Sequence, residues 1–133
     1  MFDPWGELKQ LRHITIEWRR PHPLAPAATD GQRIWIDPAA TQTERRCLLA
    51  HELVHVEERH RGCQPAAVER AVRLQTARRL IRLEDLASHM PWTRHPAELA
   101  ESLWVTEQVL LDRLAGLWPH ERRALDQLEL QPY

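Results

Sequence analysis

The strongest constraint on the fold is a change near residue 37 from the pattern of short strands to the pattern of helices. Before it, the stretch "HITIEWRR" alternates, so that Ile14, Ile16 and Trp18 share one face of a half-buried strand. A loop rich in Pro, Ala and Gly follows, and then a second short strand, "RIWID". From Asp37 onward the pattern is helical. We therefore expect an α+β fold, a mostly helical single domain with a small β-sheet or hairpin packed on a helix.

Start and stop signals divide the helical part. Thr41 and Glu44 have the spacing of a capping box and Gly62 is a natural stop, which predicts one helix of about twenty residues. A second helix should begin near Pro65 and run through "AAVERAVRLQTARRLI". Shorter helices are expected at "LEDLASHM", "PAELAESL", "TEQVLLDRLAGL" and "HERRALDQLEL". One more should precede the first strand at "DPWGELKQLR", with Asp3 as its cap.

The expected single domain spans residues 1–133 and has three parts. Residues 13–37 form the small sheet, residues 41–82 the two central helices and residues 83–133 the C-terminal helices. A chain of 133 residues has room for one modest core. Its six tryptophans supply most of the aromatic bulk and are expected to pack in that core and at its boundary.

Composition narrows the classes of partner. With 43% hydrophobic residues, 28% charged residues and a net charge of -1, the chain has no basic excess that would draw it to nucleic acid or membranes. No apolar run approaches the roughly 20 residues of a membrane span, and the start lacks the layout of a signal peptide. We therefore expect a cytoplasmic protein, in which Cys47 and Cys63 stay reduced.

The stretch "LLAHELVHVEERH" places chemistry on the first long helix. Residues four apart share a helix face, so His51 and His55 project together and can bind one metal ion. Glu52 is turned by about 100° and can lie beside the ion without ligating it, where its carboxylate can take a proton from water. This is the division of labour in HExxH metallopeptidases. Because the chain has 8 histidines, chance alone gives about 0.05 such matches, and the pattern needs support from its context.

Two histidines make a weak zinc site, so a third protein ligand is required, with the fourth position left for water. Candidates are His60, Cys63, Glu69 and His89. His60 lies one residue short of the metzincin spacing, and Cys63 would supply a thiolate, which is more typical of structural zinc sites. His89 lies far along the chain. Glu69 fits best, because a second helix packed antiparallel on the first returns its early turns toward His55.

These stretches resemble the ImmA/IrrE metallopeptidases of bacteria, phages and mobile elements, in particular their arginine-rich actinobacterial and phage branch. That family joins an HExxH helix to a second helix whose first glutamate is a zinc ligand. Here "ERAVRLQTARRLI" lies over the second helix, with Glu69 on the ligand glutamate, Ala77 on an alanine and Leu80 on a leucine. The stretches "ERRCLLAHELVH" and "RIWID" are also similar, and the resemblance covers approximately residues 13 to 115.

The resemblance implies a zinc-dependent metalloendopeptidase that holds one Zn²⁺ per chain through His51, His55 and Glu69, with Glu52 as the base. It implies a specific protein substrate, such as a helix-turn-helix repressor whose cleavage relieves repression. The substrate could add as an extended strand beside residues 33–37. Side chains considered for stabilising the oxyanion, without ranking, are His60, Arg82, His89, His95 and Tyr133.

Two positions depart from the family pattern. Arg73 stands where the family has Asn or Asp, and Gln75 where it has Phe. An Asp or Asn there would orient a ligand histidine, and arginine cannot accept a hydrogen bond. Either another acceptor replaces it, or the protein is a catalytically weak or inactive zinc-binding module that acts by binding another protein.

A DNA-binding regulator is the third hypothesis. Residues 97–115 resemble a helix-turn-helix, although Trp104 stands where the turn usually has glycine. The segment carries four acidic residues against one arginine, which disfavours phosphate contacts. Only Gln108 and Arg113 on the second helix suit base reading, so direct nucleic-acid binding is not expected.

Overall fold

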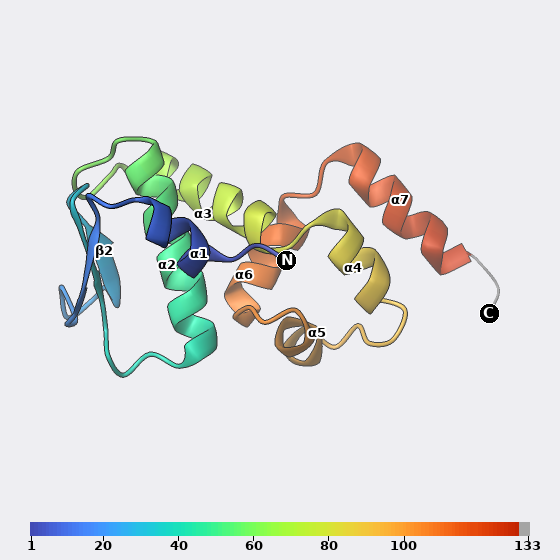
Figure 1. Ribbon diagram of the computed structural model, residues 1–133. Coiled ribbons are helices and arrows are strands. Elements are labelled where there is room, and N and C mark those ends of the chain that lie inside the picture. The colour runs from blue at the N-terminus through green and yellow to red at the C-terminus, as the bar shows by residue number, and fades with distance from the viewer. Residues whose placement is uncertain (131–133) are drawn as a thin grey trace.

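The computed structural model describes residues 1–130, in which seven helices accompany one three-stranded sheet. In chain order the elements are α1 (Pro4–Gln10), β1 (Thr15–Trp18), β2 (Ala27–Thr29), β3 (Arg33–Ile36), α2 (Gln42–Glu57), α3 (Ala66–Leu80), α4 (Leu83–His89), α5 (Pro96–Ser102), α6 (Glu107–Ala115) and α7 (Pro119–Leu130). The sheet lies at one end of the molecule beside α2, and α4 and α7 lie at the other (Figure 1). The predicted mostly helical α+β class is confirmed. Among the described helices, none combines the length and apolarity needed to cross a membrane.

The sheet has a different topology from a hairpin. The two strands expected from the sequence, β1 and β3, are present but run parallel, so the hairpin alternative is wrong. A third strand, β2, arises from the loop between them and pairs antiparallel with the other side of β3. A tight hairpin needs a loop of about two to five residues, whereas this longer loop lets the chain cross over. Because β3 is the central strand, a substrate cannot pair beside residues 33–37 as expected, and the free edges belong to β1 and β2.

Helix α2 begins as predicted and ends earlier. Both hydrogen bonds of the Thr41 and Glu44 capping box are present. The helix ends at Glu57 and not near Gly62, because Arg59 takes the left-handed conformation, with φ of 61°. The amides of Arg59 and His60 then donate back to the carbonyls of Val56 and His55, at 3.1 and 2.9 Å. This is the hydrogen-bond pattern of a Schellman cap, in which the chain stops without glycine.

The core consists of two hydrophobic clusters that meet on α2. Leu49 and Leu53 pack against the sheet in one cluster. Cys47 and Ala50, on another face of α2, pack with the C-terminal helices in the other. Leu49, Leu53 and Val54 are all 0% exposed, which confirms that the helix carrying the HExxH sequence is buried around its site. The functional helix is therefore the element that both halves of the core hold in place.

The tryptophans do not fill the core as expected, although Trp5 packs at the boundary of the cluster beside the sheet. None of the six is buried, and four are exposed: Trp18, Trp92, Trp104 and Trp118. Aliphatic side chains fill both clusters instead. The Arg78 guanidinium lies 4.1 Å from the Trp118 ring centroid, and two similar stacks involve other arginines. In an arginine-rich chain, such cation–π contacts favour an indole at the surface.

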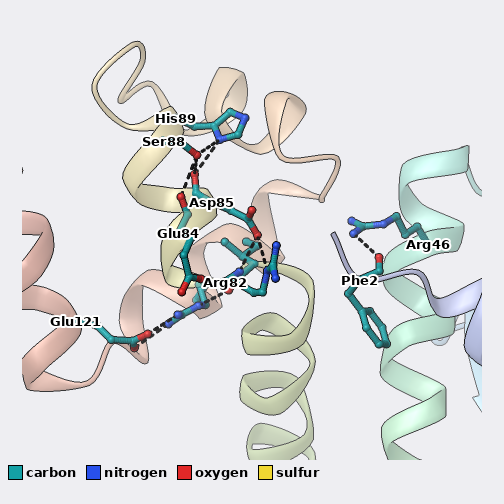
Figure 2. Close-up of polar contacts among 10 residues, drawn as sticks. Phe2, Arg46, Arg82, Glu84, Asp85, Ser88, His89 and Glu121 are labelled. Carbon is teal, nitrogen blue, oxygen red and sulfur yellow. Dashed lines mark hydrogen bonds and ion pairs between the residues drawn. The ribbon is translucent and has the colours of Figure 1, made fainter.

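A buried ion pair fixes the C-terminal helices. Arg113 of α6 donates to both carboxylate oxygens of Glu121 of α7, at 3.0 and 2.6 Å, and to the Ile81 carbonyl at 2.7 Å. Figure 2 shows Glu121 in this contact. The side chains of Arg113 and Glu121 are only 3% and 9% exposed. The paired guanidinium therefore lowers the pKa of Glu121 to about 2.

This pair predicts acid sensitivity. The pKa of Glu121 is lower in the folded chain than its ordinary value, so the stabilisation is complete above pH about 4.5 and is lost as the pH falls toward 2. We expect Glu121→Gln to lower the free energy of unfolding at pH 7 by about 3 kcal/mol. Urea titrations at several pH values should show the gap between variant and wild type narrowing steadily below pH 5. A gap that stays constant to pH 2 would rule out this account of the pair.

Candidate metal centre

Two packed helices bring three potential metal ligands together. His51 and His55 project from one face of α2, as their spacing predicts. Helix α3 packs beside α2 (Figure 1) and carries Glu69 in its first turn. One potential ligand atom from each residue lies within 4.8 Å of the other two. Within residues 1–130, His51, His55 and Glu69 are the cluster of His, Cys, Asp or Glu side chains that could hold a metal ion. The three residues predicted as ligands are thus the ones that the structure brings together.

The distances within this group fit zinc. Glu69 Oε2 lies 3.2 Å from His55 Nε2 and 3.5 Å from His51 Nε2. Bonds of about 2.0–2.1 Å at tetrahedral angles separate neighbouring ligand atoms by about 3.3 Å. The carboxylate oxygen is therefore already at the spacing that a shared ion needs from each imidazole. Two imidazoles and one carboxylate also form the ligand set typical of hydrolytic zinc sites.

The group is buried on one side and open on the other. The His55 side chain is 6% exposed, whereas those of His51 and Glu69 are 24% and 35% exposed. A water or substrate oxygen could therefore reach a fourth coordination position. Burial, together with the nearby His55, lowers the pKa of His51, which favours the neutral imidazole that metals bind. The group could thus hold a cation and is accessible from solvent.

Glu52 lies beside the ligand group without joining it. It follows His51 on α2 and is 5% exposed. Burial, and to a smaller extent the Glu69 carboxylate, raises the pKa of Glu52 to about 8. A raised pKa means a higher affinity for a proton, which suits a group that takes one up during a reaction. Its place and its environment suit the predicted proton transfer.

His60 occupies a supporting position that the sequence alone did not reveal. Its Nδ1 lies 2.9 Å from His55 Nδ1, on the opposite side of the His55 ring from Glu69. If His55 ligates through Nε2, its proton is on Nδ1 and can be donated to His60. The Schellman turn at the end of α2 carries His60 back to this place. His60 therefore supplies the acceptor that arginine at position 73 cannot provide.

This contact predicts a loss of metal affinity on substitution. We expect His60→Ala to weaken zinc binding by about 10-fold or more, because the His55 ring loses the partner that orients it. His60→Gln keeps an acceptor and should restore part of the affinity. The exposed His120 offers a matched control, His120→Ala, which should bind zinc as the wild type does. Competition titration with a chromophoric chelator measures all three, and equal affinities would refute the supporting role.

The other ligand candidates lie elsewhere. Cys63 is exposed and Cys47 is buried, and both are free thiols. His89 lies on α4, where its Nδ1 is 2.8 Å from the Asp85 carbonyl (Figure 2). Of the residues considered for the oxyanion, His60 is the one within the described chain that contacts the ligand group. Tyr133 lies outside the described residues.

Arg73 on α3 forms an ion pair with Asp112 on α6. Its Nε and Nη2 donate to the two carboxylate oxygens of Asp112, at 3.2 and 2.7 Å. It still lies close enough to the metal centre that its charge contributes to the lowered pKa of His51. Arg73 thus joins α3 to α6 through an ion pair, and Asp112 largely balances the charge of its guanidinium.

The rival DNA-binding segment keeps only one of its two base-reading side chains at the surface. Trp104 adopts φ of 59° in the turn between α5 and α6, which is the conformation that glycine usually supplies. Arg113 is buried in its ion pair with Glu121, and Gln108 donates to Asp112 at 3.0 Å. Arg113 is therefore withdrawn from any contact with DNA, whereas Gln108 stays exposed. The geometry of this segment instead fits packing against α3.

Comparisons with protein-family models, curated proteins and solved structures found no match to this chain. The resemblance to ImmA/IrrE metallopeptidases therefore stays a prediction, and it rests on the residues themselves.

Proposed function

We propose that this protein is a zinc-dependent metallopeptidase of the ImmA/IrrE type that acts in the cytoplasm of a bacterium, one Zn²⁺ being bound by His51, His55 and Glu69. One observation carries the proposal: Glu69 Oε2 lies 3.2 and 3.5 Å from the two histidine nitrogens, with the buried Glu52 next to them. A purely structural metal site has no need of a base, so a buried glutamate beside the ligands favours a catalytic one.

The side chains divide the reaction between them. Zinc, when bound, supplies a Lewis acid that polarises the scissile carbonyl and makes water more acidic. Glu52 takes a proton from the attacking water while the carbon–oxygen bond forms. It then passes that proton to the amine nitrogen as the carbon–nitrogen bond breaks. His60 keeps the His55 ring in the orientation needed for ligation.

The free edge of β2 offers a place for an extended substrate. Pro26 accepts from Asp37 at 2.8 Å and Asp30 donates to Arg33 at 3.3 Å, so residues 26 and 30 point their backbone groups toward β3. By the alternation of an antiparallel ladder, Ala27 and Thr29 point theirs away from β3. Strand β2 also packs against α2, which carries the metal ligands. A peptide pairing with this edge would lie along the helix that holds the site.

A metal-binding module with little activity is the second candidate, and Arg73 is the observation that favours it. In the family, the residue at this position would orient a ligand histidine. Here Arg73 forms an ion pair with Asp112 instead. His60 contacts His55, but His51 gains no comparable hydrogen bond to a protein group within the described residues. Such a module would bind a repressor without cutting it.

Cleavage of a candidate substrate separates the two. Zinc-loaded protein is incubated with a helix-turn-helix repressor encoded in the same genomic neighbourhood, and the products are identified by mass spectrometry. The proposal predicts fragments from one internal bond, none after chelation and their return when zinc is restored. Stable binding of the repressor without fragments would favour the non-catalytic module.

A further inference from the structure

A cavity of about 510 Å³ includes Val56, the residue that follows His55, in its wall. It lies where the turn between β2 and β3 meets the end of α2. Its walls include Asp30 and Gly31 from the turn, and Val56, Arg59 and Arg61 from α2 and the segment after it. Gly31 has φ of 92°, and the Arg61 side chain passes over it, with Cγ 3.6 Å from where a Cβ would lie. The chain after α2 is thus folded against the end of the sheet.

The cavity has an unbalanced positive charge. Asp30, its one acidic residue, already accepts hydrogen bonds from the amides of Gln32 and Arg33, at 2.9 and 2.7 Å. The side chains of Arg59 and Arg61 make no ion pair or hydrogen bond with any residue between 1 and 130, and the adjacent His13 adds a further potential donor. A carboxylate that enters the cavity could therefore accept hydrogen bonds from the guanidinium groups of Arg59 and Arg61.

Arg59 is also an unusual residue for its backbone conformation. It occupies the left-handed position that ends α2, where glycine is the common choice and a side chain adds strain. The turn therefore does not account for an arginine here. Its side chain, which lines the cavity, is the feature that glycine would lack.

The position of the cavity links it to the path of a substrate. Val56 directly follows the ligand His55, and Asp30 directly follows Thr29 on the free edge of β2. An extended peptide that pairs with β2 beside the metal centre would continue to the cavity at the end of that strand. Alternate side chains of a strand point to the same side, so one of them would enter it.

We propose that this cavity is a specificity subsite that accepts an aspartate or glutamate side chain of the peptide substrate through Arg59 and Arg61. The inference rests on the proposed peptidase function for its location. It narrows the substrate class to proteins with an acidic residue a short distance from the scissile bond.

Peptide binding to the Glu52→Gln protein tests this subsite while cleavage during the measurement is kept low. The probes are fluorescent peptide pools, amidated at the C-terminus, in which one position is fixed as Glu, Gln or Lys and the others are mixed. Fluorescence anisotropy is measured in zinc-containing buffer for three proteins: the parent, Arg59→Ala/Arg61→Ala and the charge-matched control Arg122→Ala/Arg123→Ala. Arg122 and Arg123 are exposed on α7, away from the sheet.

The subsite predicts that Glu at one position binds about 3- to 10-fold more tightly than Gln, as expected for two partly exposed ion pairs. The preference should vanish in Arg59→Ala/Arg61→Ala and persist in the control. A preference that survives in the double variant, or no preference for Glu in any pool, would overturn the subsite. Pools with a free C-terminus are measured in parallel. Binding through Arg59 and Arg61 by these pools alone would overturn the proposal, because the cavity would then take the terminal carboxylate. Repressor cleavage by the wild type reports separately on the peptidase function.

Discussion

Replacing Glu69 with alanine is expected to abolish tight zinc binding. Loss of a residue that merely supports a ligand costs about 10- to 100-fold in affinity, and loss of a ligand should exceed that range. His51 and His55 alone would leave the ion with two protein ligands, fewer than zinc sites of either kind use. Glu69 is partly exposed and near the start of α3, so the variant should still fold.

The measurement is a competition titration against a chromophoric chelator, with circular dichroism as a check of folding. Glu101→Ala, which removes an exposed glutamate from α5, is the control and should keep full affinity. Wild-type zinc affinity in the Glu69 variant would contradict Glu69 as the third ligand. Cys63, between α2 and α3, would then be the next candidate.

Replacing Glu52 with glutamine is expected to leave zinc bound and to lower the cleavage rate by about 10²- to 10⁴-fold, the usual contribution of a general base. Glutamine has nearly the same size and fits the same buried place, but its amide cannot accept a proton from water. Zinc content should be unchanged because Glu52 is not among the ligand atoms.

The wild type and the glutamine variant are compared by their initial rates of repressor cleavage, measured at equal zinc occupancy. A thermal melt shows whether the variant folds as the wild type does. If the glutamine variant cuts at the wild-type rate, Glu52 is not the base. If it loses its zinc as well, the residue has a role in the metal centre that the geometry does not predict.

Local signals in the sequence were enough for the features that depend on neighbouring residues. The capping box at Thr41 and Glu44 and the four-residue spacing of His51 and His55 need nothing beyond α2 itself. The position of Glu69 needed one more step, the return of a second helix after a short turn, and this is the packing observed.

Features that depend on distant contacts could not be predicted in the same way. The short strand Ala27–Thr29 has no clear alternation, so β2 and the parallel pairing of its neighbours became visible only in the structure. Glycine is the common residue at a helix end, so the sequence predicts a stop at Gly62, whereas Arg59 adopts the left-handed conformation here. The contacts of exposed Trp18 and Trp118 likewise involve arginines that lie elsewhere in the chain.

His60 shows the limit most clearly within the site. Its spacing excluded it as a metzincin-type ligand, and that reasoning gave no indication of a supporting role. Only the turn formed by Arg59 and His60 places its ring beside His55, at 2.9 Å between the Nδ1 atoms. A histidine five residues after a ligand histidine, at a helix end, is a signal too weak to use without that geometry.

The location of the metal tests the central claim most directly. Crystals of the zinc-loaded protein would be measured on both sides of the zinc absorption edge. The account predicts one anomalous peak per chain, about 2.0–2.2 Å from His51 Nε2, His55 Nε2 and a carboxylate oxygen of Glu69. A peak at Cys63, or none near these three side chains, would contradict it.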